Sequence, residues 1–255
     1  MQSFIPSVVL RPYIKTFLII ECEEELVNRV LPGTAPVIAF RFKGTVNYIT
    51  ENTVEALPAS MISGLRKSVR LINYTKDSGN LLVQFREGGI AAFSKQPVHE
   101  LFEESIALAN LFPATAIANL EEQLALADTH VQRIHSVEAF LQARLSGAKD
   151  DTLVMAALQQ IHLHHGDVKM KELAAQLFIS QDAFEKRFRK VVGTTPKQFA
   201  SLIKMQLVVQ QKHALQSLTE TAYEGGYFDQ AHFNKAFKNF TGLTPSEFFR
   251  SKPLW

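Results

Sequence analysis

Apolar and polar residues alternate with a period of two in several short runs within residues 1–95. The runs are rich in β-branched and aromatic residues, and turn formers such as Pro32-Gly33 and Gly88-Gly89 separate them. Such alternation is typical of half-buried strands. The pattern predicts strands in "YIKTFLII", "PVIAFRFKG", "TVNYIT", "SVRLINY" and "NLLVQFRE".

The apolar spacing then changes to three and four residues. Residues 97–112 and 119–145 both have this helical spacing, and the second segment is expected to pack within the chain, with a dimer contact left open. Its apolar stripe contains Leu120, Leu124, Val131, Ile134, Val137 and Leu141. A small polar linker follows at 146–151, and every later segment has helical period.

These periods predict an α+β protein with two domains. Residues 1–145 are expected to form a β-rich domain with trailing helices, and residues 152–255 an all-α domain. Within the second domain, we expect two helix-turn-helix units at about 168–192 and 217–241, joined by a long helix.

One motif of the C-terminal part occurs twice. "FEKRFRKVVGTTPKQFA" begins at Phe184, and "FNKAFKNFTGLTPSEFF" begins 49 residues later at Phe233. Residues 181–199 and 230–248 share eight identities in nineteen aligned positions. Such a repeat indicates that one supersecondary unit is used twice.

Local signals place helices within each copy. Ser180 and Asp229 are suited to cap helices that Gly193 and Gly242 end. The second helix of each unit is therefore predicted at 181–192 and 230–240, and the first helices at 168–177 and 218–226. We expect six phenylalanines in the core: Phe184, Phe188, Phe199, Phe233, Phe237 and Phe248.

A rigid spacer is expected between the units. Residues 197–216 contain neither glycine nor proline, and about 15 residues of helix span roughly 22 Å. Two similar helices held at such a separation are suited to successive major grooves of B-DNA, which repeat every ~34 Å.

The net charge of +2 hides an asymmetry between the two parts. Residues 1–166 contain 14 Lys/Arg and 17 Asp/Glu, whereas residues 167–255 contain 13 and 8. The positive excess of the C-terminal part indicates a polyanionic partner such as nucleic acid.

The segment "TAYEGGYFDQAHFNKAFKNFTGLTPSEFF" resembles the signature of the AraC/XylS family of bacterial transcription regulators. The resemblance covers residues 152–250, and it implies seven helices with two helix-turn-helix units that bind double-stranded DNA. Residues 1–145 resemble, in general layout, the N-terminal domains of some AraC-like regulators. The resemblance also implies RNA polymerase as a partner and leaves a homodimer open.

By this resemblance, seven positions read base edges: Asp182, Glu185, Lys186, Gln230, Ala231, Asn234 and Lys235. Lys, Gln, Asn and acidic side chains each have hydrogen-bonding partners among the bases, although Ala231 lacks the hydroxyl that is common there. Four basic residues are expected to contact phosphate: Arg189, Lys190, Lys204 and Lys238. A solvated helix face remains the alternative interpretation.

Four smaller motifs favour structural interpretations. "HLHHG" at 162–166 is expected to end a helix rather than bind a metal, and Cys22 in "ECEEE" to be a half-buried residue without reactivity. Gly88-Gly89 is expected to form a turn, with an anion site as the alternative. "GLRKSVRL" at 64–71 is interpreted as a solvated turn and strand, with binding of a ligand carboxylate as the lesser option.

The function expected from these features is DNA-binding transcription regulation, controlled by a small molecule. Residues 1–145 are expected to sense this effector or to mediate dimerisation. No catalytic residue, metal ligand or cofactor motif is identified in the sequence. The apolar runs are too short for a membrane span and no signal peptide is seen, so we expect a cytoplasmic protein. The alternatives are an enzyme-like N-terminal domain localised to DNA and a protein-interaction module.

Overall fold

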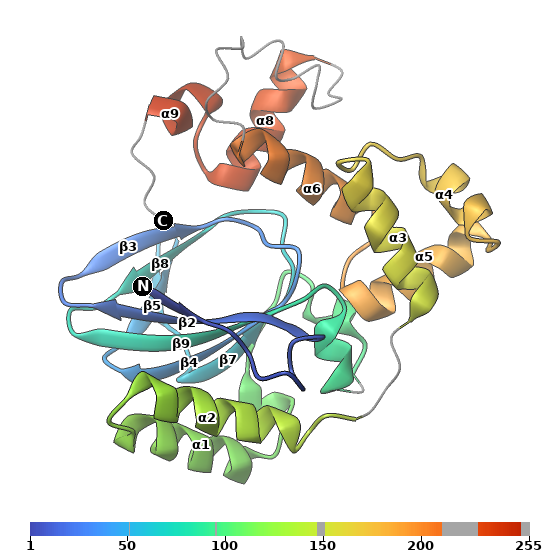
Figure 1. Cartoon of the computed structure of the whole chain (residues 1–255). Coiled ribbons are helices and arrows are strands. Elements are labelled where there is room, and N and C mark those ends of the chain that lie inside the picture. The colour runs from blue at the N-terminus through green and yellow to red at the C-terminus, as the bar shows by residue number, and fades with distance from the viewer. Residues whose placement is uncertain (51, 95, 147–150, 211–228, 251–255) are drawn as a thin grey trace.

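The computed structural model describes residues 1–50, 52–94, 96–146, 151–210 and 229–250. The chain forms a β-rich N-terminal region followed by a helical C-terminal region, as the change of period predicts (Figure 1). The α+β class is therefore confirmed. Within the described residues, no helix is both long and apolar enough to cross a membrane.

The described residues of the N-terminal region include ten strands. All five strands predicted from alternation are present, and five further strands were not predicted. The strands are β1 (Gln2–Phe4), β2 (Ile14–Cys22), β3 (Leu26–Val30), β4 (Val37–Lys43), β5 (Val46–Ile49), β6 (Val54–Ala56), β7 (Ser60–Ser63), β8 (Arg70–Tyr74), β9 (Ser78–Phe85) and β10 (Ser105–Ala107).

The strands form two antiparallel sheets. One has six strands in the order β1-β2-β9-β4-β7-β10, and the other has four in the order β3-β8-β5-β6. In β4, Ile38 and Phe40 are fully buried in the N-terminal core, whereas their neighbours Val37 and Ala39 line a cavity between the sheets. The period of two therefore assigns one face of the larger sheet to the core and the other to the cavity.

Two helices, α1 (Ala114–Leu126) and α2 (His130–Gln142), cover the larger sheet, so the prediction of one helix over 119–145 is wrong (Figure 1). Thr129 breaks the segment because it forms a capping box with Gln132 that starts a new helix. Val131, assigned to the apolar stripe, is 54% exposed. The remaining stripe residues are buried in the N-terminal core, which confirms packing within the chain.

The helix expected over residues 97–112 is also absent. This segment contains the 3-10 turns η2 (Val98–Leu101) and η3 (Leu108–Asn110) on either side of strand β10. Strand β10 pairs antiparallel with β7, so sheet hydrogen bonds replace the helix that the spacing of apolar residues suggested.

The C-terminal region consists of helices around a second core. The described helices are α3 (Thr152–Leu163), α4 (Met170–Gln176), α5 (Gln181–Val192), α6 (Pro196–Gln210), α8 (Gln230–Thr241) and α9 (Pro245–Arg250). All six predicted core phenylalanines are at most 4% exposed, which confirms their assignment. The first helix of the second unit, predicted at 218–226, and the end of the spacer lie outside the described residues.

The smaller motifs have mixed outcomes. Cys22 is half-buried, and burial raises the pKa of its thiol, in line with an unreactive residue. Gly88 adopts a left-handed φ of 76° before the short 3-10 turn η1 (Gly89–Ala92). The solvated interpretation of residues 64–71 is wrong for Arg66, which is only 8% exposed.

Candidate nucleic-acid interface

The first helix-turn-helix unit consists of α4 and α5. The Oγ of Ser180 accepts a hydrogen bond from the backbone N of Ala183, so the predicted N-cap of α5 is present. Such a cap contributes about 1 kcal/mol. Gly193 ends α5 with a φ of 100°, a conformation that a side chain disfavours. Phe184 and Phe188 are fully buried, which fixes the rotation of α5 about its axis.

This rotation directs the polar side of α5 to solvent. Asp182 and Lys186 are exposed, and Glu185 is half-buried. Arg187 is exposed too, but its Nε donates a hydrogen bond to Asp151, the N-cap of α3. The three residues predicted to read bases therefore lie on the accessible side of the helix, while Arg187 links α5 to the start of α3.

Helix α8 repeats the geometry of α5. The carboxylate of Asp229 accepts a 2.7 Å hydrogen bond from the backbone N of His232, and Gly242 ends the helix with a φ of 77°. Gln230, Ala231 and Lys235 are exposed. Asn234 differs from them because it is half-buried, and its Oδ1 is buried without a hydrogen-bond partner among the described residues.

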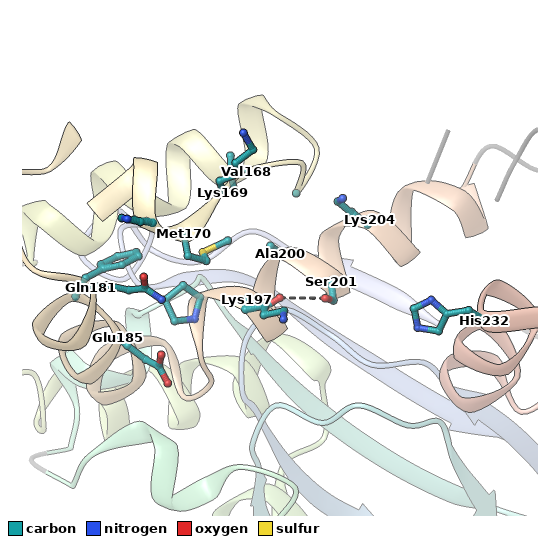
Figure 2. A pocket seen from close by; sticks show the side chains of 14 residues that line it. Val168, Lys169, Met170, Gln181, Glu185, Lys197, Ala200, Ser201, Lys204 and His232 are labelled. Carbon is teal, nitrogen blue, oxygen red and sulfur yellow. Dashed lines mark hydrogen bonds between the residues drawn. The ribbon is translucent and has the colours of Figure 1, made fainter. Parts of the chain in front are cut away.

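The N-terminal turns of α5 and α8 line the same concavity (Figure 2). Gln181 and Glu185 reach it from α5, and His232 reaches it from α8. Between them, α6 contributes one wall, and the concavity has a volume of about 620 Å³. The spacer helix therefore holds the starts of both recognition helices on one side of the domain.

Lysines dominate the charge of this concavity. Its charged lining residues are Lys169, Lys171, Glu185, Lys197 and Lys204. Lys169 and Lys204 are ion-paired with Glu172 and Asp167 outside the lining. The four lysines still exceed these three carboxylates by one charge, and this positive excess suits the phosphate backbone of a duplex passing between the recognition helices. Base edges would then face the polar sides of α5 and α8.

The predicted phosphate contacts have different surroundings. Arg189, Lys190 and Lys238 are exposed in the last two turns of their recognition helices. Lys204 lies on α6, and its Nζ donates a 2.9 Å hydrogen bond to the carboxylate of Asp167. This hydrogen bond lowers the pKa of Asp167. Lys204 therefore has an acidic partner with which a phosphate would have to compete.

Sequence reasoning missed four residues of the concavity, namely Lys169, Lys171, Lys197 and His232. Lys197 follows Pro196 in the first turn of α6, and the other two lysines, Lys169 and Lys171, flank the start of α4. Basic residues at the starts of these helices were the available signal. Their position on the recognition side depends on tertiary packing, which the sequence pattern does not show.

The N-terminal region holds both recognition helices at their opposite, C-terminal ends. A Cβ at Gly193 would lie 2.9 Å from Cγ1 of Val98, which belongs to η2. At the equivalent end of α8, Nη1 of Arg29 donates a 3.2 Å hydrogen bond to the carbonyl of Thr241. Both contacts lie at the ends of the helices away from the concavity, whose described lining residues all belong to the C-terminal region.

A further contact joins the two regions at the histidine cluster. Nε2 of His162 lies 3.0 Å from both carboxylate oxygens of Glu87. The hydrogen bond with Glu87 raises the pKa of His162. Helix α3 ends at Leu163, as predicted, and the described residues hold no group of three or more potential metal ligands.

Two family models match the chain. Residues 173–251 match a helix-turn-helix domain, and residues 2–107 match a domain of unknown function. The first match covers both recognition helices and the spacer between them. The chain therefore carries a helix-turn-helix domain of the AraC type at its C-terminus, as the repeated motif predicted.

Curated relatives are named as regulators. An uncharacterised HTH-type transcriptional regulator of Haemophilus influenzae is 29% identical over 126 residues, which are 49% of this chain and 41% of the relative. The Msm operon regulatory protein of Streptococcus mutans is 25% identical over 144 residues, or 54% of this chain and 51% of the relative. The matches thus span about half the length of these relatives or less.

Solved structures resemble the chain more distantly. ToxT of Vibrio cholerae aligns over 91% of this chain and 96% of its own, with 10% identity and a TM-score of 0.45. The C-terminal domain of AraT, a response regulator from Geobacillus stearothermophilus, aligns over 41% of this chain and 89% of its own, with 22% identity and a TM-score of 0.38. Scores this low do not establish a common fold.

Proposed function

We propose that the chain is a sequence-specific DNA-binding transcription regulator. Residues 152–255 bind double-stranded DNA, and residues 1–145 bind a small-molecule effector. The observation that supports this most directly is the lysine-rich concavity that the starts of α5 and α8 both line (Figure 2). The relatives named as transcriptional regulators support the same class over the half of the chain that they match.

The proposed base-reading set is the one that the resemblance to AraC/XylS regulators implies, and five of its seven residues are exposed. Lys186 and Lys235 occupy equivalent repeat positions and can donate to guanine, while Gln230 can pair with adenine. Asp182, Glu185 and Asn234 complete the set, with cytosine amino groups as the partners of the two acids. Ala231 offers only an apolar contact, such as a thymine methyl group.

One chain presents both helices, so the proposed DNA binding does not require a second copy. Each unit contributes one recognition helix, and α6 sets their separation. This arrangement is equivalent to the two half-site readers of a dimeric repressor. RNA polymerase, expected as a partner of this class of regulator, would be contacted from the DNA-bound state.

Binding of the full chain to random-sequence duplex DNA tests the proposal. At low salt we expect micromolar binding or tighter, with an affinity that falls steeply as salt rises, because lysines displace counterions from phosphates. Lys197→Ala should reduce the slope of log affinity against log salt by about one. Lys43→Ala, at a surface lysine of β4 paired with Asp77, is the matched control and should leave the slope unchanged. Absence of duplex binding at low salt would contradict the proposal.

A further inference from the structure

A cavity of about 250 Å³ lies between the two sheets of the N-terminal region. Both sheets contribute apolar side chains to it, among them Val37 and Leu82 from the larger sheet and Ile72 from the smaller. The volume lies just below the ~300–1,000 Å³ typical of pockets for drug-sized ligands. The cavity is therefore suited to a small molecule with an apolar body.

The charged residues of this cavity all carry the same sign. Arg41, Arg66 and Arg70 line it, and none of its described lining residues is Asp or Glu. Arg66 and Arg70 converge on one neutral atom, because the Oγ of Ser105 accepts a 2.9 Å hydrogen bond from the former and a 2.7 Å hydrogen bond from the latter. Among the described residues, neither guanidinium forms an ion pair with a carboxylate.

This arrangement leaves a buried charge poorly compensated. Arg66 is 8% exposed, and burial, followed by the charge of Arg70, lowers its pKa to about 10. The charge of Glu103 acts in the opposite direction, but its carboxylate already accepts a hydrogen bond from the backbone N of Lys67. A buried cation is costly unless an anion pairs with it.

We propose that this cavity binds a small organic carboxylate, whose charged group pairs with Arg66 and Arg70 and whose apolar body lies between the sheets. The inference rests on the proposed function, because it names the chemical class of the effector. A guanidinium binds a carboxylate through two parallel hydrogen bonds, so an anion is recognised better than an uncharged analogue. Asn80, also in the lining and 4% exposed, adds a donor, since its Nδ2 has no partner among the described residues.

The backbone around these arginines touches both recognition helices. Leu65 belongs to the C-terminal core, and its Cδ1 lies 3.5 Å from the Cβ position of Gly193 at the end of α5. At α8, Asn239 donates from its Nδ2 to the carbonyl of Lys67 and accepts at its own carbonyl from the backbone N of Val69.

Residues 64–70 therefore connect the cavity to both helices, and a ligand that repositions the two arginines also acts on the ends of α5 and α8. A ligand shifts such an arrangement by as much as its affinity differs between the bound and free arrangements.

Thermal unfolding of the full chain, with benzoate and hexanoate as probes, tests the binding site. At about 100 times its dissociation constant, a probe that fits should raise Tm by roughly 5 to 10 °C. Benzamide and hexanamide, which have the same shape without the charge, should give no comparable shift. Equal shifts from acids and amides, no shift from any acid, or a shift only with inorganic phosphate would overturn the carboxylate assignment.

Arg66→Met keeps much of the side-chain volume and removes the charge, so it should abolish the carboxylate shift. Arg86→Met, at an exposed arginine outside the cavity lining, is the matched control and should retain the shift. Arg66→Lys keeps the charge, but an ammonium group lacks the two parallel donors of a guanidinium. This variant should therefore bind benzoate at least tenfold more weakly, as measured by calorimetry. Unchanged affinity in Arg66→Lys would count against the site even if Arg66→Met failed to fold.

DNA affinity with and without benzoate tests the coupling. Benzoate should change the affinity of the wild-type chain for duplex DNA at least threefold, and Asn239→Ala should reduce that change while keeping the thermal shift. A thermal shift with no DNA binding would refute the proposed function and leave the carboxylate site standing. DNA binding without a carboxylate shift would refute only the carboxylate site.

Discussion

Gly193 and Gly242 end the two recognition helices in the same left-handed conformation, and both lie against the N-terminal region. They occupy equivalent positions of the repeat, 49 residues apart. A Cβ at Gly193 would lie 2.9 Å from Cγ1 of Val98, and one at Gly242 would lie 3.0 Å from Cγ1 of Val69. The repeat therefore sets the attachment points to the N-terminal region as well as the polar faces of the helices.

Alanine at either glycine should lower the free energy of unfolding. A left-handed conformation costs a residue with a side chain about 1–2 kcal/mol, and each new Cβ would also press on the N-terminal region. Urea unfolding of Gly193→Ala and Gly242→Ala measures the effect. Gly33→Ala is the matched control, because the nearest atom to its Cβ position is 3.7 Å away and its φ is not positive. Equal midpoints for all three variants would contradict the proposed role of the two glycines.

Lys235 and Lys238 should differ in what they do to DNA binding. Lys235→Ala should cost about 1–3 kcal/mol at a selected site and relax the preference at one base position, since Lys235 is proposed to read a base edge. Lys238→Ala should weaken binding to all DNA sequences to a similar extent and reduce the slope of log affinity against log salt by about one. Competition binding with single-base variants of the site measures both. A uniform loss in Lys235→Ala would make Lys235 a phosphate contact instead.

Substitutions at Lys204 and at Asp167 should change the affinity for duplex DNA in opposite directions. Lys204→Ala removes a cation from the concavity and should weaken duplex binding, whereas Asp167→Asn removes a neighbouring anion and should strengthen it by several-fold. Fluorescence anisotropy at two salt concentrations compares them. Asp128→Asn, at a carboxylate next to the N-cap of α2, is the control for loss of an acid and should change binding less. Weaker binding by Asp167→Asn would show that the ion pair orders the site rather than competing with phosphate.

The contact between His162 and Glu87 should make the junction of the two regions sensitive to pH. Glu87 raises the pKa of His162 above its ordinary value of about 6.5, so the stabilisation is complete below that pH and is lost as pH rises through the raised value. The difference in Tm between the wild type and Glu87→Gln should therefore be larger at pH 6 than at pH 8. Glu122→Gln, at an exposed carboxylate of α1, should show no such trend. A difference that is constant or grows with pH would contradict this prediction.

The C-terminal helices were predictable from the sequence because local signals determine their ends. Ser180 and Asp229 cap α5 and α8 as predicted, and Gly193 and Gly242 end them. Each of these signals acts within one helical turn. The buried phenylalanines followed from their spacing alone, so the exposed sides of both helices could be assigned as well.

The N-terminal region depends more on partners that are distant in sequence. Strand β10 has apolar spacing that suits a helix, yet it pairs with β7 about 40 residues earlier. The break at Thr129 was available from its capping box with Gln132, but the apolar stripe on both sides outweighed it. Arg66 could not be placed from its polarity, because its burial follows from the packing of two sheets and a helical region around it.

Mapping the bases contacted in a selected DNA site shows whether both recognition helices bind one face of the duplex. Fragments bound by the full chain are enriched from random duplex DNA, and methylation interference then locates the contacted guanines. Two helices held by α6 on one side of the domain should give two short contacted segments in the major groove, about one helical turn or 10 base pairs apart. A single contacted segment, or two segments on opposite faces of the duplex, would show that α5 and α8 do not bind DNA together.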